Sequence, residues 1–242
     1  MLETKVVGGV HLPPTELHLA EMLLKSPKID WPFGGWRRAY QWKKLIFAVK
    51  EVAPESRTVV LDIGAHVGMW SQWFAGYFDH VHAFEPVPEH RAIFPLNLAP
   101  YENWTMHDCA LGDVAGTVHM DRRADNTGNT HVADDAIDPG LRGKQELIKT
   151  RVVRLDDLGF DNLDRSRIAL IKIDVEGYEL PVCRGAEKLI RLHRPVMIVE
   201  QKGNDEKFYG HERGEAKLFL ESLGMFSIKE FSGDHIMVWP KA

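Results

Sequence analysis

Two hydrophobic patterns alternate along most of this chain. Short segments rich in apolar residues, typical of strands, are separated by segments in which apolar residues recur every three or four positions. The apolar runs predict strands at 58–63, 80–84, 104–110, 169–174 and 196–200. The other segments predict helices at 68–78, at 88–98 with a bend at Pro95, and at 178–193 with an interruption at Gly185. Strands that alternate with helices indicate an α/β fold whose parallel sheet is covered on both faces.

The pattern changes near the end of the chain. After a helix expected at 212–223, strands at 225–231 and 235–239 flank a Ser-Gly-Asp turn. Two strands joined by so short a turn predict a hairpin, and therefore an antiparallel end to a mostly parallel sheet.

The first part of the chain lacks the regular alternation. Residues 1–55 are expected to form a short helical and aromatic extension to the domain formed by residues 56–242. One interpretation of this extension is a cap over the active site. Within the extension, Thr15 is expected to cap a helix at 17–24, and a second helix is expected at 41–52.

A polar insertion is expected at 112–158, with a short strand at 117–120. Its segment 121–140 is too rich in polar residues, Gly and Asn to be core, so it is either a mobile surface loop or a substrate loop. Four residues in expected loops are candidate substrate contacts. For the two in the extension, Trp36 and Arg37, the alternative is packing against the main domain. The four candidates are Trp36, Arg37, Asn129 and His131.

The composition narrows the class of protein. Of 242 residues, 44% are hydrophobic and 27% are charged, as in soluble globular proteins, and the net charge of −5 disfavours a nucleic-acid partner. No apolar run reaches the length of a membrane span. Cys109 and Cys183 lack the spacing of a metal site and favour a reducing compartment. We therefore expect a cytoplasmic protein without a nucleic-acid or membrane partner, and a homo-oligomer stays open.

Candidate chemistry begins at the turn after the first expected strand. Gly64 and Gly68 carry no Cβ, so a ligand can approach the backbone closely, and the next helix begins with free amide donors. Glu85, at the end of the second strand, suits hydrogen bonds to two ribose hydroxyls. Asp62 places negative charge where a pyrophosphate would lie, which favours the cationic ligand S-adenosylmethionine over NAD. Asp108, at the end of the third strand, could accept a hydrogen bond from the adenine amine.

A second group of charged residues ends the fourth and fifth strands of the sheet. Asp174 and Glu176 follow Lys172 at one strand end, and Glu200 ends the next strand. Such charges are costly to bury unless they are paired or used, and ligands of open α/β sheets bind at this edge. The structural alternative is an ion-pair network of Lys172 with Asp174 or Glu200. The carboxylates could also hold Mg²⁺ or Ca²⁺, but we expect no resident metal.

Three motifs in this order resemble the FkbM-type methyltransferases over roughly residues 57–201: DIGAHVG (62–68), AFEP (83–86) and IKIDVEG (171–177). The resemblance implies a Rossmann-like class I methyltransferase sheet and S-adenosylmethionine as cofactor. It also implies methylation of a hydroxyl of a sugar, glycoside or natural product, so the partner would be a small-molecule or glycan acceptor. The cofactor contacts implied are Asp62, Gly64, Gly68 and Glu85, with Asp108 near the adenine. Ala65, His66 and Ala110 are further candidate cofactor contacts.

The candidates for assisting methyl transfer are the carboxylates at the ends of the fourth and fifth strands. We expect Asp174, Glu176 or Glu200 to orient or deprotonate the acceptor hydroxyl. His66 stands where the family pattern leads us to expect an asparagine. Two alternatives stay open: an oxidoreductase that uses a nicotinamide cofactor, and a protein that binds an adenosyl ligand without catalysis.

Overall fold

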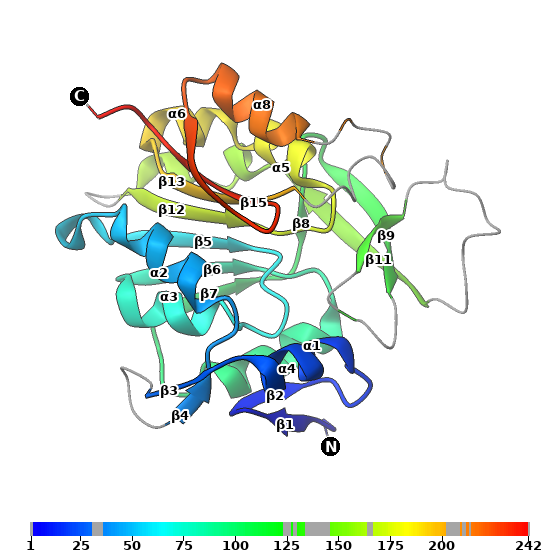
Figure 1. Cartoon of the computed structure of the whole chain (residues 1–242). Coiled ribbons are helices and arrows are strands. Elements are labelled where there is room, and N and C mark those ends of the chain that lie inside the picture. The colour runs from blue at the N-terminus through cyan, green and yellow to red at the C-terminus, as the bar shows by residue number, and fades with distance from the viewer. Residues whose placement is uncertain are drawn as a thin grey trace.

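The computed structural model describes residues 2–30, 36–122, 127, 130–133, 146–163, 167–201, 209, 212 and 214–241. At its centre lies a sheet of seven strands (Figure 1). These strands are β5 (Val59–Ile63), β6 (His80–Phe84), β7 (Trp104–His107), β12 (Ile168–Ile173), β13 (Val196–Glu200), β14 (Phe226–Phe231) and β15 (Asp234–Val238). Their order across the sheet is β14-β15-β13-β12-β5-β6-β7.

The central sheet is mostly parallel with an antiparallel end. β5 pairs in parallel with β6 and β12, whereas β15 runs antiparallel to both β13 and β14. Every residue of β5 and β12 is buried, because helices cover both faces of the sheet. The expected α/β fold with a Rossmann-like sheet and a C-terminal hairpin is confirmed.

Helices form one layer on each side of this sheet (Figure 1). α2 (Trp42–Lys50), α3 (Ser71–Tyr77) and α4 (Pro88–Asn97) pack on one face, and α5 (Glu179–Gly185), α6 (Glu187–His193) and α8 (Glu215–Ser222) pack on the other. Short 3-10 turns lie at η1 (Pro54–Ser56), η4 (Leu155–Asp157) and η5 (Phe160–Asn162). Among the described helices, none has the length and apolar character that a membrane span requires.

The N-terminal extension contains strands as well as helices. Besides α1 (His18–Lys25) and α2, it forms the hairpin of β1 (Lys5–Val7) with β2 (Val10–Leu12) and that of β3 (Lys28–Asp30) with β4 (Trp36–Arg38). Strands of three residues are too short for their alternation to be read from the sequence. Asn97 of α4 joins the extension to the domain through hydrogen bonds with the backbone amide and carbonyl of His11, at 2.7 and 2.9 Å.

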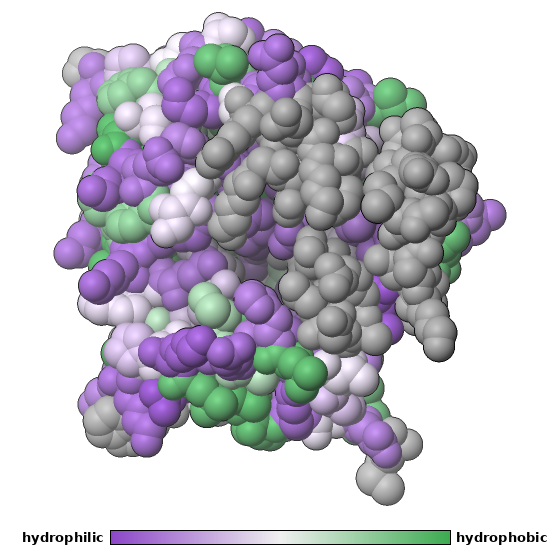
Figure 2. Space-filling model, turned by 45° about the vertical axis from the view of Figure 1, so that its right-hand side comes forward, coloured by the Kyte–Doolittle hydropathy of each residue, from purple (hydrophilic) through white to green (hydrophobic). Residues whose placement is uncertain are grey.

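The helix cap in the extension differs from expectation. The first turn of α1 is capped by Glu16, whose Oε1 accepts a hydrogen bond from the amide of Leu19 at 2.8 Å, so the cap expected of Thr15 is wrong. Hydrophobic surface gathers on the lower part of the molecule in Figure 2. The exposed apolar side chains of the extension include Val6, Leu17 and Leu24.

The polar insertion carries a second sheet instead of irregular structure. Its strands are β8 (Ala110–Leu111), β9 (Gly116–Arg122), β10 (His131–Ala133) and β11 (Glu146–Val153), in the order β10-β9-β11-β8. The strand expected at 104–110 is therefore divided between two sheets, since its residues belong to β7 and β8. The first residues of β9 are exposed, so they lack the apolar alternation that would have revealed the strand's full length.

Candidate active site

Two neighbouring cavities open at the carboxyl ends of β5 and β12. The first, which we call the apolar cavity, is lined largely by hydrophobic residues. Its walls include Phe84, Glu85, Val87, Ala110, Leu111, Met120, Thr127, Val132 and Tyr178. The second, the acidic cavity, includes His18, Tyr40, Gln41, Ala65, Trp70, Lys172 and Glu200. Gly64, His66, Asp174 and Glu176 line both cavities and mark their boundary.

The glycine turn after β5 is shaped by close packing. Gly64 has φ +76°, and a Cβ there would lie 1.9 Å from the carbonyl oxygen of Asp174. Gly68 has φ +87°, and a Cβ there would lie 2.5 Å from a methyl group of Leu98. Both positions therefore require glycine, because a side chain would push the turn off β12 or off the end of α4.

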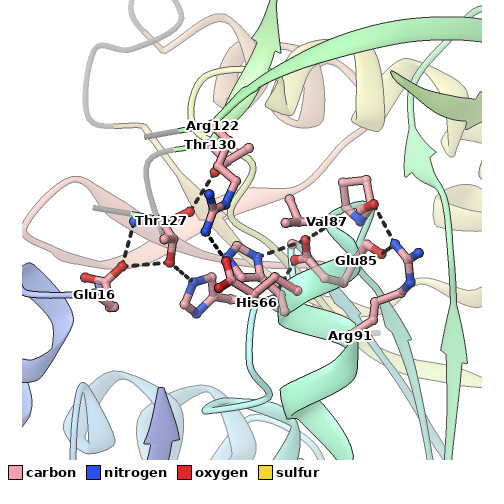
Figure 3. A network of polar contacts seen from close by, with 12 residues as sticks. Glu16, His66, Glu85, Val87, Arg91, Arg122, Thr127 and Thr130 are labelled. Carbon is pink, nitrogen blue, oxygen red and sulfur yellow. Dashed lines mark hydrogen bonds and ion pairs between the residues drawn. The ribbon is translucent and has the colours of Figure 1, made fainter. Parts of the chain in front are cut away.

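Glu85 is a buried carboxylate at the wall of the apolar cavity (Figure 3). Its Oε2 accepts a hydrogen bond from the amide of His66 at 2.8 Å, and its Oε1 accepts one from the amide of Val87 at 2.8 Å and lies 3.2 Å from Nδ1 of His90. Burial raises the pKa of Glu85, but His90 and the two amides more than offset this and hold the pKa below its usual value. Glu85 is thus an oriented anion at neutral pH.

Asp62 lies beneath the turn and faces the protein interior. It is fully buried; its Oδ2 accepts a hydrogen bond from the Ser71 hydroxyl at 2.6 Å, and its Oδ1 lies 3.2 Å from Nζ of Lys172. Lys172 also donates a hydrogen bond to the carbonyl of Gly64 at 2.7 Å. Burial lowers the pKa of Lys172, but the carboxylates of Asp62 and Asp174 raise it above its usual value. Asp62 and Lys172 therefore support the turn from below.

The three expected catalytic carboxylates come together. Asp174, Glu176 and Glu200 each bring an oxygen within 4.8 Å of the others. Glu176 has φ +57°, a conformation uncommon for residues other than glycine, which costs about 1–3 kcal/mol and is found most often at functional sites. Three carboxylates this close favour a cationic ligand, and their oxygens are also the type that Mg²⁺ and Ca²⁺ bind.

The other expected contacts are dispersed. Ala110 lines the apolar cavity and Ala65 the acidic cavity, as a ligand contact requires. Asp108 is largely exposed and lies 3.6 Å from Arg151, a placement that gives no support to an adenine contact. His131 is buried in β10, opposite Asp121 of β9. Trp36 and Arg37 belong to β4 but their side chains lie outside what the structure describes, and so does the whole of Asn129.

Sequence reasoning missed several residues of the cavity walls. His18, Tyr40 and Gln41 of the extension and Trp70 of the main domain line the acidic cavity. The aromatic character of the extension was a signal for such a role, but it did not distinguish these positions from ordinary packing residues.

Glu179 holds the segment that carries Asp174 and Glu176. Its Oε1 accepts hydrogen bonds from the amides of Val175 and Gly177, both at 3.1 Å. Burial, and then the charge of Glu200, raise the pKa of Glu179 to about 8. Glu179 is therefore mostly protonated at neutral pH.

We expect Glu179→Gln to make the protein more stable than wild type in alkaline solution. Between pH 4.5 and about 8 the folded state keeps this proton and the unfolded state has lost it, so wild-type stability falls as pH rises through that window. Glutamine cannot ionise and keeps the accepting oxygen. The midpoints of thermal unfolding of both proteins at about pH 6 and about pH 9 test this. The difference should widen at the higher pH, and Glu187→Gln, on the exposed start of α6, should show no widening.

Comparison with known proteins finds one family model that matches more than half of this chain. The family model described as the Methyltransferase FkbM domain matches residues 62–226. "Methyltransferase 1" of Beauveria bassiana is 27% identical over 154 residues, which are 57% of this chain and 62% of that protein. This chain thus spans less than two thirds of the length of that relative.

Solved structures with a similar arrangement are also found. The methyltransferase FkbM of Methylobacillus flagellatus has a TM-score of 0.45 and 18% identity, over 78% of this chain and 48% of that one. A putative O-methyltransferase of Klebsiella pneumoniae has a TM-score of 0.48 and 17% identity, over 84% of this chain and 81% of that one.

Proposed function

This chain belongs to the FkbM methyltransferase family, and on that premise we propose that it transfers a methyl group from S-adenosylmethionine to a hydroxyl group of a sugar, glycoside or other natural product. The observation that carries the proposal is the boundary between the two cavities. Asp174 and Glu176 line both cavities, so a group bound in the apolar cavity and a group bound in the acidic cavity meet beside the same two carboxylates.

The residues present fit an adenosyl cation. Phe84, Val87 and Leu111 offer an apolar wall for a purine, and Glu85 offers an oriented carboxylate for the ribose hydroxyls. Asp174 and Glu176 offer negative charge for the ammonium and the sulfonium. When bound, this cofactor supplies an electrophilic methyl group on a positively charged sulfur.

The chain's own contribution is to position the acceptor and to remove its proton. Tyr40 and Trp70 of the acidic cavity offer aromatic faces against which a sugar ring can lie, and the cavity restricts the approach of the hydroxyl oxygen to the methyl group. Asp174 or Glu176 accepts the hydroxyl proton as the new oxygen–carbon bond forms. Glu200, which lines the acidic cavity but not the apolar cavity, orients the acceptor by accepting a hydrogen bond from a second hydroxyl.

The proposal is tested by incubating the protein with a panel of sugars and glycosides and with cofactor carrying an isotopically labelled methyl group. Mass spectrometry should show label on an oxygen of one class of acceptor. Parallel reactions with EDTA and with added Mg²⁺ test whether the three carboxylates work with a metal ion. Binding of S-adenosylhomocysteine without turnover on any hydroxyl would support the non-catalytic alternative, and label on nitrogen would refute the choice of acceptor atom.

A further inference from the structure

Glu16 joins the N-terminal extension to the polar insertion. It lies outside the residues matched by the family model, yet it is fully buried (Figure 3). While its Oε1 caps α1, its Oε2 accepts hydrogen bonds from the amide and the hydroxyl of Thr127, at 2.6 and 2.7 Å. Thr127 is itself fully buried and is held by Thr130, whose hydroxyl donates to the Thr127 carbonyl at 2.7 Å. A carboxylate that accepts three hydrogen bonds is a strong and specific anchor.

The same threonine reaches the glycine turn. Oγ1 of Thr127 lies 3.0 Å from Nε2 of His66. A threonine hydroxyl has one proton, and here that proton is directed to Glu16, so the oxygen must accept a hydrogen bond from His66. Nε2 of His66 therefore carries the hydrogen and Nδ1 is left as an acceptor.

The surroundings of His66 keep its imidazole ring neutral and fixed in position. Burial, and then the neighbouring His90, hold the pKa of His66 well below its usual value. The His66 and His90 rings pack with their centroids 3.9 Å apart. The His66 backbone has φ +51° and its amide is bonded to Glu85. The ring is thus held on both sides at the boundary of the two cavities.

We propose that Glu16 is a positioning residue for the cofactor site. Acting through Thr127, it selects the tautomer of His66 whose Nδ1 accepts a hydrogen bond from a donor group of the bound nucleoside ligand. This inference rests on the proposed function, since it concerns the same cofactor. It makes cofactor binding depend on the docking of a segment outside the family domain, because Glu16 reaches Thr127 only when the extension is in place.

The chain offers closely matched variants. Glu16→Gln leaves one acceptor oxygen for three donors, so the NH₂ group of the glutamine must face a donor of either α1 or Thr127. Thr127→Val removes the hydroxyl with almost no change of side-chain shape. We expect each to weaken binding of S-adenosylhomocysteine about tenfold, measured by calorimetry on the full chain. Thr127→Ser keeps the hydroxyl and should bind like wild type. Glu21→Gln, on the exposed face of the same helix, is a control for the loss of a charge.

A second measurement, the tautomer of His66, separates this proposal from a purely structural role of Glu16 and Thr127. Nitrogen NMR of the histidine rings in the free protein should show His66 protonated at Nε2 in wild type and in Thr127→Ser, and a mixture of tautomers in Thr127→Val. Should wild type bind S-adenosylhomocysteine while Glu16→Gln and Thr127→Val bind it equally well, this inference is overturned and the proposed function stands. Should wild type fail to bind that ligand at all, both are overturned.

Discussion

Replacing Asp174 by asparagine is expected to lower kcat by about 10²–10⁴-fold, the usual contribution of general acid–base catalysis. The substitution keeps the shape of the side chain and removes its ability to take a proton. Asp174 faces both cavities with its side chain about one quarter exposed, at 27%, so a bound acceptor can reach it. Affinity for S-adenosylhomocysteine should change far less, because that ligand has no positive charge on sulfur and Glu176 stays available for its ammonium group.

Two further variants separate the roles within the cluster. Glu176→Gln should also lower kcat, since Glu176 faces both cavities, whereas Glu200→Gln should mainly raise KM for the acceptor because Glu200 lines the acidic cavity. Asp161→Asn, in an exposed pair with Lys188, controls for the loss of a negative charge. Initial rates with the acceptor identified by mass spectrometry provide the measurement. If all three cluster variants turned over within about threefold of wild type, the assignment of the base to this cluster would be wrong.

Lys44→Met is expected to destabilise the protein by about 3–5 kcal/mol, because it leaves a buried carboxylate without its cation. Lys44 of α2 forms a buried ion pair with Asp234 of β15, and it also donates a hydrogen bond to Gln41 at 3.0 Å. The pair joins the N-terminal extension to the last hairpin of the central sheet. Urea denaturation followed by circular dichroism measures the loss.

Two controls show whether the lost charge is the cause. Lys43→Met changes an exposed neighbour on the same helix and should alter stability by no more than about 0.5 kcal/mol. The double variant Lys44→Met/Asp234→Leu should recover most of the loss, since an apolar pair of similar volume needs no counter-charge. A loss below about 1 kcal/mol in Lys44→Met would show that the pair contributes little.

Much of the fold and part of the site could be predicted from short stretches of sequence. The strands at 80–84 and 196–200 have the expected bounds. For the second of them the reason is its run of consecutive apolar residues, which are buried on both faces of a covered sheet. The meeting of Asp174, Glu176 and Glu200 follows from the same pattern, since parallel neighbouring strands bring their carboxyl ends to one edge. The second sheet was missed because the start of β9 is exposed and carries no such pattern.

The sequence by itself determined the layers, the parallel sheet and the edge at which the carboxylates gather, because each depends on residues that are near one another along the chain. Only the tertiary structure decided the partners of the buried polar groups. Asp62 faces Lys172 because β5 and β12 pair in that register, and Glu16 reaches His66 through Thr127 because the extension docks on the insertion. Each of these contacts joins residues far apart in sequence, so their positions are set by strand register and by the packing of whole segments.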